Sequence, residues 1–439
     1  MANSGQEWIT RQNRPEGMAP AASARSSNGL RPRPIPHNEP LGPHTVVSRV
    51  AFFLAALGPG VLGLCADNDA GGMLSYLVTG ASHSLAWMVP TLLALVFPTL
   101  FIQWLALRLA LTTRLPYSKV LIRVVGRPAA IVEAVAVYGI NSLILVTEFM
   151  GMSLVLRQVG LPIPLALALT LGLIVYLTSA HVYPRIERLL LWTALANLAF
   201  IPALLFVHRA PHALATAFTA SPTINPWFLL LAMAGNAVAP WMVYWQQNAV
   251  WAGTSRTRQQ RVWDLSLGVA AWVVMASVVL WLGALTPGSQ SAFQSPIAWI
   301  FRRGGHVAGT LFAVGLFDAG LLAACTVSLS SLWTVREAVG RGARCPSEAP
   351  NRGKWMAVHV LTLGAAAGFV LIPGLSPGWV ALWAQAAGAV WLPVTLILLG
   401  LVARNANVMG RRAIGPLAQV TLGLVAAVFL AVGILGLLA

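Results

Sequence analysis

Five acidic side chains of this 439-residue chain lie inside long apolar stretches, where a charge is hardest to accommodate. They are Asp67, Asp69, Glu133, Glu148 and Asp318, and no Lys or Arg stands centrally in these stretches to neutralise them. At the centre of a bilayer a carboxylate costs on the order of 2.5–3.5 kcal/mol, so it usually faces water, a cation or a proton relay. The residue types therefore predict a site that handles cations.

Asp69 is the strongest candidate because its segment cannot be one continuous helix. The run Gly58-Pro59-Gly60 is followed by the polar segment 65–72, and a second interruption covers residues 235–241. Backbone carbonyls freed at such a break can join a carboxylate as hard oxygen ligands. Two breaks at corresponding places, five apolar spans apart, favour an inverted-repeat transporter with its site at the membrane midplane.

The other four carboxylates leave alternatives open. Asp67 could add charge to the same site or face the vestibule that leads to it. Glu148 could belong to a proton path, or it could be a protonated carboxyl hydrogen-bonded to a neighbouring helix. We expect Glu133 near the membrane interface, and Asp318 has no assigned role.

The acidic residues lie on segments that the composition predicts to be membrane-spanning helices. The chain is 57% apolar and only 9% charged, whereas soluble domains carry about 25% charged residues. Apolar runs long enough to cross about 30 Å of hydrocarbon recur along it. They predict an all-α, polytopic protein of the inner or plasma membrane with these eleven spans: 48–81, 85–107, 129–156, 163–181, 187–207, 226–251, 264–286, 307–335, 355–372, 378–403 and 415–438.

The basic residues predict the orientation. With the N-terminus in the cytoplasm, 24 of the 28 Lys and Arg fall on the cytoplasmic side, and only Arg157, Arg209, Arg302 and Arg303 fall outside. This asymmetry satisfies the positive-inside rule and puts the C-terminus outside the cytoplasm. The net charge of +16 thus encodes topology, and we expect no nucleic-acid partner.

Two further features of the sequence say little about function. Residues 1–45 are polar, Pro- and Arg-rich, and lack the apolar core of a signal peptide, so we expect a disordered cytoplasmic tail. Cys65, Cys325 and Cys345 form no CxxC pair, which argues against a zinc site and a disulfide framework.

Six motifs, in order along residues from about 50 to 435, resemble the Nramp family of divalent-metal transporters. Gly58-Pro59-Gly60 followed by Asp69-Ala70-Gly71-Gly72 is similar to the family's first span with its Asp-Pro-Gly-Asn signature. Residues Gly235 to Pro240 stand where the family has Met-Pro-His. The remaining matches are 147–151 in the third span and, for the eighth and tenth spans, 312–316, 319–321, 384–385 and 407–410.

The departures from the family pattern concern side chains that could bind an ion or a proton. Gly72 replaces the first-span Asn, Ala239 replaces the sixth-span Met, Trp241 and Gln246 replace two His, and Leu145 replaces a third-span Asp. These changes resemble the Nramp-related branch associated with magnesium. Without a thioether, an all-oxygen site suits Mg²⁺ or Mn²⁺, and the extra volume suits a partly hydrated ion.

The resemblance implies the fold and a set of site residues. It implies an inverted-repeat, leucine-transporter-type fold with helices 1 and 6 broken: a core over 46–403, with repeats 46–207 and 226–403, and an additional helix over 415–438. It makes Asp69 the carboxylate ligand, Gln385 a tenth-span ligand or gate, and the carbonyls of Ala66 and Asn236 contacts of the ion.

Other residues at the breaks have two expected roles each. The Asn236 amide could bind the ion or the broken backbone, and Gln246 and Gln247 could line the inner vestibule or join helices. Gly71 and Pro240 complete the two motifs.

We therefore expect a membrane transporter of divalent cations, not an enzyme, with Mg²⁺ ahead of Mn²⁺ as substrate, no cofactor, and weak or no proton coupling. The alternative is a proton-coupled Mn²⁺/Fe²⁺ symporter. An intramembrane aspartyl protease using Asp69 and Asp318 is disfavoured because neither Asp follows a Gly-x-Gly run. An amino-acid carrier of the same fold is disfavoured because Asp69 would repel a substrate carboxylate. The oligomeric state stays open.

Overall fold

The computed structural model describes residues 57–179, 189–207, 213–219, 223–251, 257–285, 290–340 and 353–438. All the regular elements in these ranges are helices. Judged by length and composition, eight of these helices could cross a membrane. The expected tail over 1–45 and the beginning of the first span lie outside the described residues.

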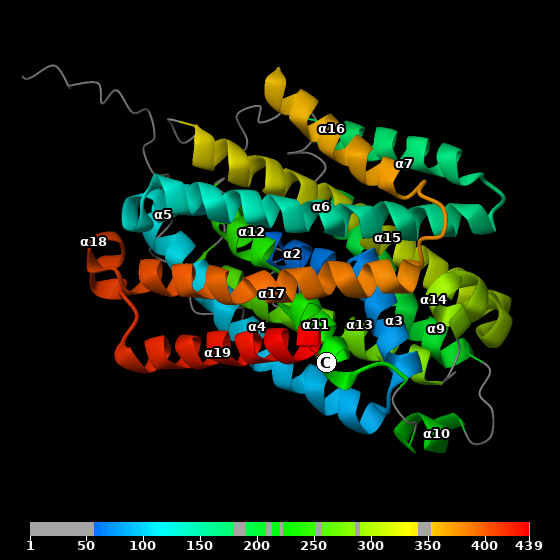
Figure 1. Cartoon of the computed structure of the whole chain (residues 1–439). Helices are drawn as coiled ribbons and strands as arrows, with labels where there is room; N and C mark the ends of the chain where they lie inside the picture. Colours follow the sequence, from blue (N-terminus) through cyan, green and yellow to red (C-terminus); the bar gives the residue numbers. More distant parts are fainter. Residues whose placement is uncertain are drawn as a thin grey trace, which may run out of the picture. The chain divides into compact units, whose positions relative to one another are not determined.

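Each of the eleven predicted spans corresponds to helical structure, and Figure 1 shows the helices as a bundle of long elements running along one direction. The first span consists of α2 (Pro59–Asp67) and α3 (Ala70–Ser82), and the sixth consists of α11 (Pro226–Ala237) and α12 (Pro240–Trp251). The remaining spans are α4 (Leu85–Thr113), α6 (Arg127–Gln158), α7 (Ile163–Leu177), η1 (Ala194–Ala199) with α9 (Phe200–Phe206), α13 (Arg258–Ala284), α15 (Pro296–Val339), α16 (Lys354–Phe369), α17 (Pro377–Arg404) and α19 (Pro416–Leu438).

Two features differ from the prediction. Helix α15 begins at Pro296, well before the predicted start at 307, because two helical segments join at Gly305 with a positive φ of 81°, which glycine adopts readily. Short elements too small to show as apolar spans connect the long helices: α5 (Tyr117–Val125), α10 (Ala213–Thr219), α14 (Gln290–Gln294), α18 (Ala406–Met409) and η2 (Gly410–Arg412).

Both predicted helix breaks are present. After α2, Asn68 leaves helical geometry and Asp69 begins α3 as its N-cap. After α11, Val238 is extended, with φ −145° and ψ 93°, and α12 begins at Pro240. Proline fits the first turn of a helix because the amide N–H that it lacks has no helical partner there.

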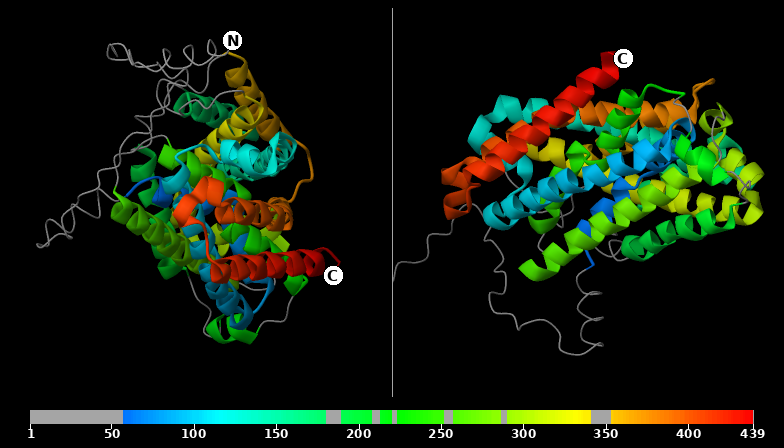
Figure 2. Two further views of the ribbon diagram at one scale, coloured as in Figure 1. Left: turned by 90° about the vertical axis from the view of Figure 1, so that its left-hand side faces the viewer. Right: turned by 90° about the horizontal axis from the view of Figure 1, so that it is seen from below.

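Glycines allow the helices around the breaks to approach closely. A Cβ on Gly80 of α3 would meet the backbone of Leu280 in α13, and a Cβ on Gly283 of α13 would meet the backbone of Leu77 in α3. Small residues commonly mediate such backbone-to-backbone packing between membrane helices. Helices α6 and α15 also pack along much of their lengths, and their ribbons lie side by side in Figure 1 and in both views of Figure 2.

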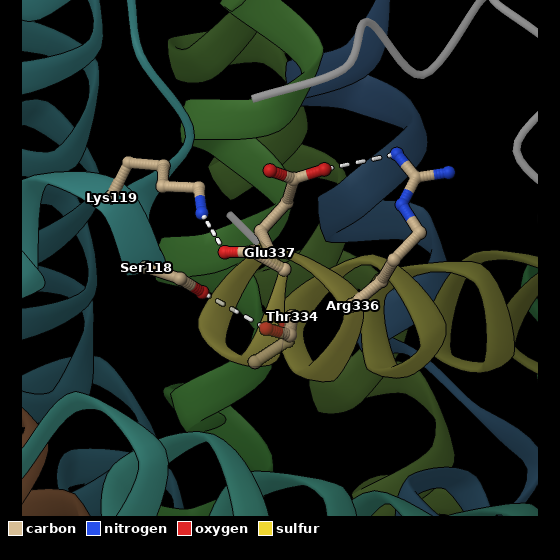
Figure 3. A network of polar contacts seen from close by, with 6 residues as sticks. Ser118, Lys119, Thr334, Arg336 and Glu337 are labelled. Atoms are coloured by element: carbon tan, nitrogen blue, oxygen red, sulfur yellow. Dashed lines mark hydrogen bonds and ion pairs between the residues drawn. The ribbon is translucent and has the colours of Figure 1, made fainter. Parts of the chain in front are cut away.

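One end of the bundle gathers basic side chains, and we call it the basic end; it contains Arg108, Lys119, Arg127, Arg258 and Arg412. Ser118 Oγ and Lys119 Nζ of α5 donate to the carbonyls of Thr334 and Gly340, at 3.0 and 2.6 Å (Figure 3). Arg127 also donates to the Val339 carbonyl. Arg336 forms an ion pair with Glu337 at 3.1 Å. Cationic donors at the end of α15 complement its helix dipole.

Candidate functional site

Asp69 lies at the break between α2 and α3 and is buried, with 3% of its surface exposed. Its carboxylate accepts the Gly72 N–H, as expected for an N-cap residue. From α17, Gln385 Nε2 donates to both carboxylate oxygens, at 3.1 and 3.3 Å. The structure therefore joins the first broken helix to the tenth-span glutamine through Asp69.

Glu148 of α6 also contacts this break, and it is fully buried. In a continuous helix the Ala70 N–H would donate to the Ala66 carbonyl, four residues earlier. Here that N–H donates instead to Glu148 Oε2 at 2.8 Å, while Thr147 Oγ1 donates to Glu148 Oε1 at 3.0 Å. Glu148 thus helps to keep the helix broken. As a result, the Ala66 carbonyl does not receive the hydrogen bond that the Ala70 N–H would donate in a continuous helix.

The second broken helix supplies Asn236, which lies against Gly72. A Cβ on Gly72 would collide with the Asn236 amide, so the absence of a side chain at position 72 makes room for the amide from α11. Gly71 faces Thr147 and the Gln385 amide in the same way, and Gly235 lies against the Gln385 backbone. Residues from α3, α6, α11 and α17 therefore converge on one small region.

Some buried polar atoms in this region have no hydrogen-bond partner in the described part of the protein. They are Asp67 Oδ2 and Asn68 Oδ1, and the nearby Asn236 amide interacts with the side chain of Tyr76. Asp67 and Asp69 are close enough to interact electrostatically, and so are Asp69 and Glu148. Nevertheless, no group of three or more His, Cys, Asp or Glu side chains among the described residues is arranged to hold a metal ion.

The remaining residues of the sixth-span motif are buried around α12. Ala239 is 2% exposed, and Pro240 begins α12. Trp241 packs against Trp245, with ring centroids 6.4 Å apart, and Trp245 stacks on Trp333 of α15 at 5.9 Å.

The two glutamines of α12 are also buried, but only one has a described hydrogen bond. Gln247 Nε2 donates to Thr113 Oγ1 and to the Leu115 carbonyl, so this residue joins α12 to the end of α4. Gln246 is 5% exposed.

Asp318 and Glu133 make their described hydrogen bonds away from the breaks. Asp318 of α15 accepts from Asn197 Nδ2 of η1 at 2.7 Å. Glu133 is buried between α6 and α17, where it accepts from Trp391 Nε1 at 2.8 Å and Thr395 Oγ1 at 2.6 Å. Glu133 stands in the second turn of α6, and its place near the membrane interface stays a prediction.

Sequence reasoning missed Asp264, which anchors the first broken helix. From α13, its Oδ1 accepts the N–H groups of Gly58 and Val61 at 2.8 and 2.9 Å, and its Oδ2 accepts that of Gly60 at 2.7 Å. A buried carboxylate thereby caps the N-terminus of α2 from another helix. The sequence signal was an acidic residue at the very start of a predicted span.

Comparisons with known proteins identify solved structures with a similar fold and a family model that matches this chain. A manganese transporter variant from Eremococcus coleocola superposes with a TM-score of 0.68 at 17% identity, covering 91% of this chain and 88% of that one. A second variant of that transporter gives 0.69 at 16% identity, with the same coverage. A nucleobase-cation-symport-1 family transporter gives 0.55 at 13% identity, covering 87% and 91%. No curated protein matches the sequence.

The predicted all-α fold of the leucine-transporter type is confirmed by these structures. Residues 60–439 match the family model described as natural resistance-associated macrophage protein-like. The chain therefore belongs to the Nramp family of multi-pass membrane transporters, and it is not an enzyme.

Proposed function

We propose that this protein carries divalent cations across the membrane by alternating access, with Mg²⁺ ahead of Mn²⁺. The ion would bind beside Asp69, between the α2–α3 and α11–α12 breaks. The observation that carries the proposal is a buried carboxylate at a helix break, surrounded by polar oxygens that lack protein partners. A hard cation with its water shell is the partner that such a set of groups would best accept.

The donor set favours a partly hydrated ion. The side-chain ligands would be the Asp69 carboxylate and the Gln385 amide, which contact each other. Among the described residues, no group of three Asp, Glu, His or Cys side chains lies close enough together to hold a metal ion. Mg²⁺ commonly keeps several waters and binds through one or two carboxylates. The Ala66 carbonyl and the Asn236 amide would supply further oxygen ligands, and Asp67 would add charge beside them.

The preference for Mg²⁺ and Mn²⁺ is based on the absence of sulfur and imidazole ligands from positions 239, 241 and 246 of the sixth span. Ala239 carries no sulfur, and Trp241 and Gln246 carry no imidazole. Soft and borderline ions prefer sulfur and imidazole, whereas oxygen ligands suit Mg²⁺ and Mn²⁺. Because the Eremococcus coleocola relative is a manganese transporter, Mn²⁺ is the first competitor to test.

Uptake into proteoliposomes tests the proposal directly. We expect Mg²⁺ and Mn²⁺ to enter and to compete with each other, and Ca²⁺ to compete weakly. Empty liposomes and liposomes that carry the Asp69→Asn variant serve as controls. Uptake of Mn²⁺ that Mg²⁺ in large excess leaves unchanged would contradict a magnesium site.

We also propose that the basic end faces the cytoplasm and that the two repeats are 46–207 and 226–403, with α19 outside them. Cytoplasmic segments are enriched in Lys and Arg, as the basic end is. A reporter that is active only in the cytoplasm, fused after Ala439, should then be inactive. An active fusion would overturn the orientation.

A further inference from the structure

A groove of about 220 Å³ opens at the basic end, between α4, the start of α13 and η2. Three arginines line it, Arg108, Arg258 and Arg412, together with the ring of Trp104. Arg108 is half-buried, and Arg258 and Arg412 are exposed. The groove lies apart from the helix breaks and plays no part in the proposed transport site.

The positive charge in the groove has no described counter-charge. None of the three arginines forms an ion pair with a carboxylate among the residues that the structure describes. Three guanidinium groups at one groove repel one another unless an anion lies between them. Guanidinium groups pair especially well with phosphate, because their paired N–H donors match its oxygens.

Arg108 is held in place for such a ligand. Its guanidinium lies over the Trp104 ring, 5.2 Å from the centroid, and its Nε donates to the Arg412 carbonyl at 3.1 Å. These contacts occupy the face and one nitrogen of the guanidinium. No described hydrogen bond engages its two terminal nitrogens, so the group is positioned at little further entropic cost.

An aromatic stripe leads from the groove along α4 toward the apolar middle of the bundle. Phe97 stacks on Phe101 with centroids 6.0 Å apart, and Phe101 stacks on Trp104 at 6.3 Å. Phe97 is 60% exposed, and Val262 and Trp263 of α13 are each 41% exposed. In a membrane protein such an exposed apolar surface faces lipid.

We propose that this groove binds the phosphate headgroup of an anionic phospholipid, whose acyl chain lies along the stripe formed by Phe97, Phe101 and Trp104. Basic pockets between membrane helices on the cytoplasmic side suit such headgroups. A free phosphate ion would use the arginines but not the aromatic stripe. The combination of both features at one place selects the lipid.

Native mass spectrometry of the purified full-length protein tests the site. The protein is titrated with phosphatidylglycerol, cardiolipin or phosphatidylcholine. Each basic side chain near an anionic lipid surface contributes about fivefold to binding. We therefore expect Arg108→Gln/Arg258→Gln/Arg412→Gln to bind the two anionic lipids about 100-fold more weakly, since three such contributions are lost and their factors multiply.

A matched variant separates the groove from net charge. Arg157→Gln/Arg302→Gln/Arg303→Gln removes the same charge from exposed arginines that lie outside the groove, and we expect it to bind both lipids as the unmodified protein does. Trp104→Leu keeps every charge and should still weaken anionic-lipid binding.

Three results would overturn the proposal. Phosphatidylcholine could bind as well as phosphatidylglycerol, or both triple variants could lose the same affinity. Alternatively, millimolar inorganic phosphate could displace the lipid, which would make the groove a site for the free anion.

Discussion

At the scale of single residues, Gly72 leaves the space beside Asp69 that the amide of Asn236 occupies. The resemblance described above implies an Asn at the position of Gly72. In this protein the amide comes from α11 and fills the space beside Gly72. The polar group is thus kept near Asp69 but is supplied by the other broken helix.

This packing predicts a compensating pair of substitutions. Gly72→Asn alone should collide with Asn236 and destabilise the protein by about 1–3 kcal/mol, the usual cost of overpacking. Adding Asn236→Ala should restore the space and most of the stability. Thermal unfolding in detergent measures both variants, with Asn236→Ala alone as the control. Equal stability of the single and double variants would show that the two side chains do not compete for one space.

A second residue-scale prediction concerns Asp69. Asp69→Asn removes the charge but keeps a similar shape, and we expect uptake of Mg²⁺ and Mn²⁺ to fall more than about 100-fold, beyond the usual loss for a group that only supports a ligand. The matched control is Glu133→Gln, another buried carboxylate, hydrogen-bonded to α17. Uptake is measured in proteoliposomes at equal protein density. If Asp69→Asn still transports at the unmodified rate, Asp69 is not a ligand.

The third residue-scale prediction concerns ion choice. Ala239→Met restores a polarisable sulfur and takes up volume that water would otherwise fill. We expect Cd²⁺ and Mn²⁺ to compete with Mg²⁺ about tenfold better than before, because thioethers prefer softer ions. Ala239→Leu, which is similar in size but lacks sulfur, is the control. An unchanged competition profile would mean that position 239 does not face the ion.

Sequence reasoning named residues of the candidate site more readily than their contacts. Asp69 was predicted because a carboxylate at a break in an apolar span is rare, whereas Gln385 and the contact through Asn236 were implied by the resemblance to the Nramp family. The bond from Ala70 N–H to Glu148 was not predicted, because it joins residues 78 positions apart. Which of two nearby polar groups a side chain contacts depends on packing that one sequence does not specify.

At the scale of elements, α2 is a nine-residue helix whose N-terminus is held by one carboxylate on another helix. Such a short helix has little stability of its own and depends on its contacts. Asp264 satisfies three of its terminal N–H groups. Loss of these bonds should release α2 from α13 while leaving the remaining helices in place.

This prediction can be tested with a native thiol. Cys65 of α2 is buried, and in a Cys325→Ala/Cys345→Ala background it is the single cysteine. We expect Asp264→Ala to leave three N–H groups unsatisfied, at about 1–3 kcal/mol each, and to increase alkylation of Cys65 by a maleimide at least about tenfold. Asp264→Asn keeps one acceptor oxygen and should give an intermediate rate. Ser266→Ala on the exposed face of α13 should not change the rate.

The elements themselves were largely predictable from the sequence. Long apolar runs gave every span, and the breaks were visible as Gly, Pro, Asn and Asp within them. The start of α15 was placed too late because Arg302, Arg303 and the glycines beside them interrupt the apolar pattern, although the backbone stays helical up to the turn at Gly305. The anchoring of α2 by α13 left only a weak signal, an acidic residue at the start of the predicted span 264–286, because its partners lie more than 200 positions away in the sequence.

At the scale of the whole molecule, the described part of the candidate site offers few groups that could pass protons. A proton path through a membrane uses ionisable side chains, typically Asp, Glu and His, spaced for transfer. Asp67, Asp69 and Glu148 remain, but Leu145, Trp241 and Gln246 are all buried and offer no titrating group near neutral pH. Glu148 is moreover engaged with the Ala70 N–H and the Thr147 hydroxyl.

We therefore predict that metal transport is weakly coupled, or not coupled, to protons. Proteoliposomes with a pH-sensitive dye inside should show metal uptake without matching acidification, and an inward proton gradient should raise the uptake rate less than about twofold. An ionophore that collapses the gradient is the control, and Glu148→Gln should then keep most of its uptake, since its amide oxygen can still accept the Ala70 N–H. A metal-dependent proton influx comparable in size to the metal flux would establish symport instead, with Glu148 as the first residue to carry the proton.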